Sequence, residues 1–194
     1  MIKTIAANTD GTLLMDVMTQ DYFRHRYAEQ YGLDALTSFS KGNAKDRERC
    51  SILKKELKAS GEIQEAPMPN AELLINHLKE KGFAFVIYAG APVESSLKKY
   101  ADIGIAINGA YTAQGMNRNN PEVFRNIREL MLKNGFDPIA YLTHVPDNAK
   151  ASATAWGKGL LSEPIKESDD RIYQFDWNIL SIDEIEKIIA FLKK

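Results

Sequence analysis

Residues 5–14, "IAANTDGTLL", run from an apolar segment directly into a polar turn. The apolar residues before Asn8 are typical of a short buried strand, and the pair Asp10-Gly11 favours a tight turn. Polar side chains that directly follow a strand lie at its carboxyl end, and open α/β sheets bind their ligands at that end. The stretch therefore predicts that Asn8 and Asp10 lie at a binding site.

The composition indicates one compact cytoplasmic domain. The 194 residues, 44% of them hydrophobic, suffice for one core and a small subdomain. The 25 basic and 26 acidic residues nearly cancel, so net charge gives no general attraction to nucleic acid or anionic membranes. The single cysteine, Cys50, cannot form an intramolecular disulfide, and the first residues lack a secretion signal. No apolar run approaches the roughly 20 residues that span a bilayer.

Five short segments have the pattern of buried strands, and helical patterns separate most of them. The predicted strands are residues 3–7, 84–89, 104–107, 140–143 and 171–175. The best-defined helices are residues 70–81, 121–133 and 181–194. Such alternation implies parallel strands joined by helical crossovers. The sequence therefore predicts an α/β fold, with a Rossmann-like three-layer core and a mostly parallel sheet of about five strands.

Residues 15–69 break this alternation, because their pattern is helical only. Two amphipathic helices are expected, over residues 19–36 and 45–60. A helical insertion directly after the first strand would lie over the ligand-binding end of the sheet, as a cap. We therefore expect a core domain of residues 1–14 and 70–194 and an all-helical cap of residues 15–69.

The second of these helices is rich in basic side chains. Seven lie between residues 41 and 58: Lys41, Lys45, Arg47, Arg49, Lys54, Lys55 and Lys58. A solvated helix face explains such a run in most proteins, and a docking surface for an acidic partner is the alternative.

Several parts follow one another along the chain: a strand ending in "NTDGTLL", a helical insertion, and the later segments "FAFVIYAGAP", "NNPEVF" and "AYLTHVPDNA". This order resembles that of the haloacid dehalogenase superfamily of phosphohydrolases. The resemblance covers nearly the whole chain. Its most specific element is the first motif, which reads Asp-x-Asp-Gly-Thr in the family and Asn8-Thr9-Asp10-Gly11-Thr12 here. It implies a phosphate-handling site at the ends of the strands.

Asn8 stands where the resemblance implies a nucleophilic aspartate. In the family this carboxylate attacks phosphorus and bridges to Mg²⁺. A carboxamide is neutral and weakly nucleophilic, and it brings no charge to the metal. The second aspartate of the motif, a general acid and base in the family, is retained as Asp10. The motif therefore keeps its proton-transfer residue and lacks its nucleophile.

Two phosphate-binding positions of the family are also changed. Ala89 stands where the family has a Ser or Thr hydroxyl, so that donor is missing. Backbone amides around Gly90 could still bind an anion at the start of the next helix, or Gly90 could serve only as a turn residue. The family's lysine position falls on Arg118, which keeps the charge but has a longer, planar head group. Arg118 either faces the site or points to solvent.

The metal-binding acids of the family are absent from the loop after residue 143. Their positions fall on Val145 and Ala149, so Asp147 is the one acid left in this loop. Asp147 is out of register, and a helix N-cap or turn role explains it more simply. His144 is a conceivable acid, base or ligand, or a strand-end histidine whose ring is satisfied by the backbone.

Together, these changes predict a degenerate phosphatase site that works by binding. The protein would be weak or inactive as an enzyme, would bind a protein partner or a small phosphorylated ligand, and would bind Mg²⁺ weakly or not at all. Ser95 and Ser96 lie inside a predicted helix and offer no replacement nucleophile. The alternative is a Mg²⁺-dependent phosphohydrolase of small phosphate esters, similar to phosphoglycolate phosphatases, in which Asn8 is an engineered or tolerated change. The metal ligands would then be Asn8, Asp10 and Asp147.

Overall fold

The computed structural model describes residues 1–32, 44–163 and 168–194. These residues form two compact units, a larger one of Met1–Met15 with Pro67–Lys194 and a smaller one of Asp16–Ala66. The larger unit contains the polar strand end at Asn8, and the smaller unit contains the basic helix. Within the described residues, no helix is both long and apolar enough to cross a membrane.

The larger unit is built on one sheet of six parallel strands, in the order β5-β4-β1-β6-β7-β8. The strands are β1 (Ile2–Ala7), β4 (Ala84–Ala89), β5 (Gly109–Thr112), β6 (Phe136–Thr143), β7 (Lys158–Leu161) and β8 (Ile172–Gln174). β1 lies inside the sheet, with Ala6 opposite Val86 of β4 and Tyr141 of β6. The carboxyl ends of these three strands therefore lie at the same edge of the sheet.

Helices follow most of these strands. They are α4 (Ala71–Glu80), α5 (Val93–Asp102), α6 (Pro121–Lys133), α7 (Pro146–Trp156) and α8 (Ile182–Lys193), with the 3-10 turn η1 (Trp177–Ile179) before the last. The Asn120 side chain accepts a hydrogen bond from the Glu122 amide at the start of α6. Ser181 caps α8 in a similar way, with the Glu184 amide as donor. These side chains satisfy amides that the helix itself leaves free.

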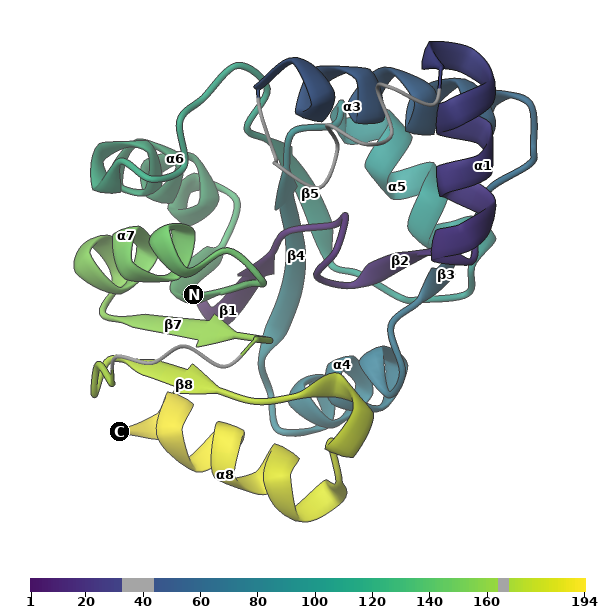
Figure 1. Cartoon of the computed structure of the whole chain (residues 1–194). Helices are drawn as coiled ribbons and strands as arrows, with labels where there is room; N and C mark the ends of the chain where they lie inside the picture. The colour runs from purple at the N-terminus through teal and green to yellow at the C-terminus, as the bar shows by residue number, and fades with distance from the viewer. Residues whose placement is uncertain (33–43, 164–167) are drawn as a thin grey trace. The chain divides into compact units, whose positions relative to one another are not determined.

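Helices of the larger unit cover both faces of its sheet (Figure 1). Alternate strand residues pack against different helices, so both faces are buried. Ile5 and Ala7 belong to a cluster that includes apolar residues of α4 and α8. Ala6, Tyr88 and Tyr141 belong to a second cluster, with residues of α6 and α7. Helices on both sides of a parallel sheet make a three-layer α/β core, so the predicted fold class is confirmed.

The predicted strand over residues 104–107 is wrong, and β5 follows it. Gly104, with φ of +75°, and Ile105 instead complete the end of α5, where the Ile105 amide bonds the Tyr100 carbonyl at 3.0 Å. Ile105 is buried, which explains the apolar pattern, but its amide is already used. Pairing with β4 begins only at Asn108, whose amide donates to the Phe85 carbonyl and whose side chain accepts from the Phe85 amide.

Strand β7 has no counterpart among the predicted strands, so the sheet has six strands where about five were expected. The strand is only four residues long, and it lies between β6 and β8. It contains Gly159, a residue that weakens a strand pattern. Three of its four residues are buried, and so short a strand shows no alternation of polar and apolar residues, so periodicity does not reveal it.

The smaller unit packs α1 (Gln20–Tyr31) and α3 (Ala44–Ala59) around one apolar cluster. The buried members of this cluster are Phe23, Tyr27, Leu53, Leu57 and Ile63. The interval of residues 15–69 is not helical only, because β2 (Leu14–Val17) pairs with β3 (Gln64–Pro67) where the chain passes between the units. The predicted last turn of the first helix, residues 33–36, and Lys41 lie outside the described residues.

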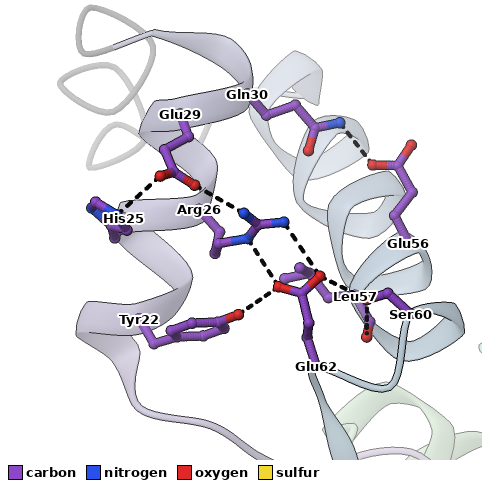
Figure 2. Close-up of polar contacts among 9 residues, drawn as sticks. All are labelled: Tyr22, His25, Arg26, Glu29, Gln30, Glu56, Leu57, Ser60 and Glu62. Atoms are coloured by element: carbon purple, nitrogen blue, oxygen red, sulfur yellow. Dashed lines mark hydrogen bonds and ion pairs between the residues drawn. The ribbon is translucent and has the colours of Figure 1, made fainter.

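A polar network around Glu62 joins α1 to the end of α3 (Figure 2). The Tyr22 hydroxyl donates to Glu62 Oε2 at 2.6 Å, and the Ser60 hydroxyl donates to Oε1 at 2.8 Å. Arg26 Nε lies 3.2 Å from Glu62 Oε2. The hydrogen bond from Tyr22 is the largest of the effects that together lower the pKa of Glu62. These contacts are largely exposed, so we expect them to orient the helices more than to stabilise them.

Part of the basic run is paired with acidic residues of the same unit. Lys58 Nζ lies 2.8 Å from Asp16 Oδ1 and 2.7 Å from Glu65 Oε1, and Lys54 Nζ lies 3.3 Å from Asp16 Oδ2. Arg49 Nη1 lies 3.7 Å from Asp46 Oδ1. Three of the seven basic side chains therefore have acidic neighbours within their own unit. A docking surface for an acidic partner stays a prediction.

Asp16→Asn is expected to lower the free energy of unfolding by about 1 kcal/mol at neutral pH. Burial acts to raise the pKa of Asp16, but the hydrogen bonds and charges of Lys58 and Lys54 lower it overall. A carboxyl with a lowered folded-state pKa stabilises the fold above its unfolded pKa of about 4, and this contribution is lost as the pH falls through the folded pKa. The variant and the natural protein should therefore converge in stability toward pH 3.

Urea unfolding of both proteins at pH 7 and pH 3 measures this effect. Asp170→Asn, which removes an exposed carboxylate of the larger unit, is the control for the change in net charge. A stability difference for Asp16→Asn that stays constant between the two pH values would contradict the ion pairs as its origin.

Candidate functional site

A tight turn after β1 places Asn8 at the strand end. The Asn8 amide bonds the Leu142 carbonyl of β6 at 2.9 Å, so its backbone is still held by the sheet. The Thr9 carbonyl then accepts a hydrogen bond from the Leu13 amide at 2.9 Å, which closes the turn. Gly11 has φ of +69°, a conformation that glycine adopts without strain. The Asn8 side chain is therefore placed by the sheet and is 7% exposed.

His144 supports this turn from the end of β6. Its Nδ1 lies 2.9 Å from Thr12 Oγ1, and its backbone N–H donates to the same oxygen at 3.1 Å. A methyl group on Gly11 would lie 2.9 Å from Cε1 of the His144 ring, so the close approach also requires glycine. The partner of the histidine ring is therefore a buried threonine hydroxyl, and the contact holds two strand ends together.

The guanidinium of Arg118 reaches back to Asn8 from the connection between β5 and α6. Its Nη1 donates to Asn8 Oδ1 at 2.7 Å and to the Tyr141 hydroxyl at 2.8 Å. The Tyr141 hydroxyl in turn donates to the Tyr88 carbonyl at 2.8 Å. Of the two orientations that the sequence left open, Arg118 takes the one that faces Asn8.

The tyrosines below Arg118 are neutral and tightly packed. Burial raises the pKa of Tyr88 to about 12 and holds that of Tyr141 well above its ordinary value, although the charge of Arg118 opposes both shifts. Both phenols therefore keep their protons at neutral pH. Each ring makes an edge contact with Phe124, at centroid distances of 5.8 Å from Tyr88 and 5.0 Å from Tyr141. The hydroxyl that holds Arg118 is thus itself fixed by the core.

A pocket with a volume of about 270 Å³ opens at the ends of β1 and β4, and we call it the strand-end pocket. Its lining comprises residues 8–10, residues 89–91, one side of α5 and Arg118. The catalytic and phosphate-binding positions predicted from the sequence therefore all line this one pocket. All of these residues belong to the larger unit.

The charges around the strand-end pocket favour an anion. Its lining contains two cations, Arg118 and Lys99, and one carboxylate, Asp10, which leaves one net positive charge. Asp10 is 74% exposed, and its Oδ1 lies 4.0 Å from Lys99 Nζ. The first amides of α5 add a partial positive charge, because its N-cap residue, Pro92, provides no side-chain hydrogen bond. Glu94 opposes this effect from the same turn.

Asp147 does not line the strand-end pocket. It is exposed in the first turn of α7, where an acidic side chain interacts favourably with the helix dipole. The N-cap position is occupied by Val145, whose amide donates to Thr143 Oγ1 at 3.1 Å. Among the positions predicted for the metal, the structure therefore brings Asn8 and Asp10 to the pocket and leaves Asp147 outside it.

Several pocket residues were not predicted from the sequence as site residues. Ser95 and Lys99 are four residues apart on α5, so they lie on the same side of the helix and form one wall of the pocket. That spacing could have identified them. Thr9 also lines the pocket, and it follows Asn8 directly. Tyr141 gave no signal, because a tyrosine inside an apolar strand reads as a core residue.

The donors at the strand-end pocket do not fit Mg²⁺, the metal that the fold resemblance implies. Mg²⁺ demands oxygen ligands in octahedral geometry, usually from one or two carboxylates together with phosphate oxygens of the substrate. The Asn8 oxygen is neutral and already accepts a hydrogen bond from a guanidinium. Asp10 is the one carboxylate in the lining; it is 74% exposed, and the positive charge of Lys99 Nζ lies 4.0 Å from its Oδ1. In the part of the chain that the structure describes, no three His, Cys, Asp or Glu residues are placed to hold a metal ion.

No protein-family model and no curated protein sequence matches the chain. Solved structures do match over nearly its whole length. One is a haloacid dehalogenase-like family hydrolase from Xanthomonas campestris, with a TM-score of 0.61, 9% identity and coverage of 99% of this chain and 96% of that chain. A second is a beta-phosphoglucomutase from Pyrococcus sp. strain ST 04, with a TM-score of 0.59, 15% identity and coverage of 97% and 99%.

A third match is CbbY from Rhodobacter sphaeroides, solved in complex with phosphate. Its TM-score is 0.55 and its identity 15%, with both chains covered completely. These TM-scores show that the chains share a fold, and identities this low carry no information about activity. The function must therefore be argued from the strand-end pocket itself.

Proposed function

We propose that this chain, which has the haloacid dehalogenase-like fold, binds a small phosphate-bearing anion in the strand-end pocket without hydrolysing it. The observation that carries the proposal is the 2.7 Å hydrogen bond from Arg118 Nη1 to Asn8 Oδ1. It joins a cation to a neutral amide at the position where phosphoryl transfer would need an anionic nucleophile. The pocket therefore attracts phosphate and lacks the group that would attack it.

Asn8 is poorly suited to attack phosphorus. Its side-chain oxygen carries no negative charge, and the Arg118 guanidinium withdraws electron density from that oxygen. Ala89, at the end of β4, brings no hydroxyl that could orient a phosphoryl oxygen. Asp10 could still transfer a proton, but proton transfer alone does not break a phosphate ester when the nucleophile is missing.

The strand-end pocket retains what an anion needs. Arg118 can donate to two oxygens of one phosphate group through its planar head. Lys99 adds a second positive charge from α5, and residues 89–91, which precede that helix, line the same pocket. The volume of about 270 Å³ provides room for a small molecule.

Neither the natural protein nor Asn8→Asp is expected to hydrolyse p-nitrophenyl phosphate or a panel of small phosphometabolites in the presence of Mg²⁺. In the variant, the new carboxylate would pair with Arg118, which would compete with a metal ion for it, and Asp147 would still lie outside the pocket. Release of p-nitrophenol and of inorganic phosphate measures the result.

The double variant Asn8→Asp with Asp10→Asn is the control for a contaminating phosphatase, because it removes the remaining acid of the turn. Mg²⁺-dependent turnover by the natural protein would overturn the proposal in favour of a phosphohydrolase. So would a strong gain of turnover in Asn8→Asp that disappears in the double variant.

A further inference from the structure

We propose that Arg118 is a built-in cation of the strand-end pocket, so that the pocket holds a phosphate group without a divalent metal ion. This inference rests on the proposed function, since it concerns how the same pocket binds its anion. Three features support it: the rigid anchoring of Arg118, its remaining donors, and the neutral amide at position 8.

The anchoring of Arg118 extends from the guanidinium down into the core. Nη1 donates to Asn8 Oδ1 and to the Tyr141 hydroxyl, at 2.7 Å and 2.8 Å. Tyr141 is fully buried and donates onward to the Tyr88 carbonyl, and its ring packs on Phe124. A long side chain that is already ordered loses little further entropy when a ligand binds. The charge is therefore held in place before the anion arrives.

The guanidinium keeps donors for a ligand. Both hydrogen bonds found for Arg118 among the described residues use Nη1. Its Nε and Nη2 groups carry three further N–H donors in the fork geometry that matches two oxygens of a phosphate. Arg118 is half-buried and lines the strand-end pocket. One edge of the guanidinium is thus used by the protein, and the other edge suits an oxyanion.

The amide of Asn8 leaves the charge of Arg118 available. A carboxylate at this position, 2.7 Å from Nη1, would form an ion pair with the guanidinium and cancel much of its charge. The amide accepts the same hydrogen bond without bringing a charge. Asn8 and Arg118 therefore act as a pair, in which the neutral partner orients the cation and the cation binds the anion.

The Arg118–Asn8 pair and a damaged metal site predict opposite effects of Asn8→Asp on phosphate binding. If position 8 had merely lost a metal ligand, Asn8→Asp should strengthen phosphate binding in the presence of Mg²⁺. If Arg118 is the built-in cation, Asn8→Asp should weaken phosphate binding with or without Mg²⁺. The affinity of the natural protein should then be the same, within about twofold, in MgCl₂ and in EDTA.

Isothermal titration of the full chain with inorganic phosphate tests the proposal, in buffers with MgCl₂ and with EDTA. We expect Arg118→Gln to weaken phosphate binding about 10- to 100-fold and Asn8→Asp to weaken it about tenfold. Arg125→Gln is the matched control, because Arg125 is exposed on α6, contacts Glu122 and lies outside the pocket lining. Circular dichroism verifies that each variant is folded.

Arg118→Lys serves as a second variant if Arg118→Gln does not fold. It keeps the charge but loses the fork, so its affinity should fall between those of the natural protein and Arg118→Gln. Phosphate binding that requires Mg²⁺ would overturn the inference and leave the proposed function intact. Equal affinities of Arg118→Gln and Arg125→Gln would also overturn it. Failure of the folded natural protein to bind phosphate in either buffer would overturn the proposed function itself.

Discussion

Phe124→Ala is expected to lower the free energy of unfolding by about 3–5 kcal/mol. Phe124 is fully buried on α6. It makes edge contacts with Tyr88, Tyr141 and Trp156, and its carbonyl accepts a hydrogen bond from Trp156 Nε1 at 2.8 Å. Removing the ring leaves a cavity whose other walls are large aromatic rings on a sheet and a second helix. Such walls collapse poorly, so the upper part of the range is expected.

Urea unfolding followed by tryptophan fluorescence measures this change. The matched control is Leu130→Ala on the same helix, because Leu130 is 48% exposed and its loss should cost about 1 kcal/mol or less. The packing argument would be refuted by equal destabilisation in the two variants. A lower phosphate affinity in Phe124→Ala would also be informative, since this ring supports the tyrosine that anchors Arg118.

Gly159→Ala is expected to lower the free energy of unfolding by about 1–3 kcal/mol, although the change adds only one methyl group. A Cβ at this position would lie 2.8 Å from the Ala149 carbonyl oxygen and 3.3 Å from the Ala149 Cβ. The obstacle is mostly backbone of α7, which cannot rotate away as a side chain can. The helix would have to move off β7 to accommodate the methyl group.

Gly109→Ala is the matched control for this prediction. A Cβ at Gly109, in β5, would meet the Phe136 ring at an ordinary distance of 3.7 Å. Alanine there should leave stability unchanged or raise it slightly, because it restricts the unfolded chain. Thermal unfolding of the two variants gives the comparison. If Gly159→Ala is as stable as Gly109→Ala, the close approach of α7 to β7 is not a constraint on the fold.

The elements that the sequence predicted well are those with local signals. Strand β4 and helix α6 have the predicted bounds, since a continuous apolar run marks the first and Pro121 marks the start of the second. Only the second half of β6 was predicted, because Pro138 is unusual inside a strand; it lies beside the register shift between β1 and β6. Strands β5 and β7 depend on pairing with neighbours, which a four-residue segment does not encode by itself.

The position of the candidate site was predictable, and its main contact was not. The residues that follow β1 and β4 had to lie close together, because parallel neighbours end at the same edge of a sheet. The contact between Arg118 and Asn8 depends on the path of the irregular segment 113–120, where no periodicity fixes side-chain direction. Its second partner, Tyr141, is hidden within a strand, so the sequence left the orientation of Arg118 open.

The chain leaves and re-enters the larger unit at neighbouring points. Strands β2 and β3 pair there, and the Met68 amide donates to the Leu13 carbonyl at 2.8 Å. The smaller unit is therefore an insertion whose two ends are held together by the contact between Leu13 and Met68. The entropy of closing so long a loop must be met before β1 can join β4. If the smaller unit folds first, it already brings the ends of this loop together. The chain between β1 and β4 is then effectively shorter, and the effective contact order of the sheet falls.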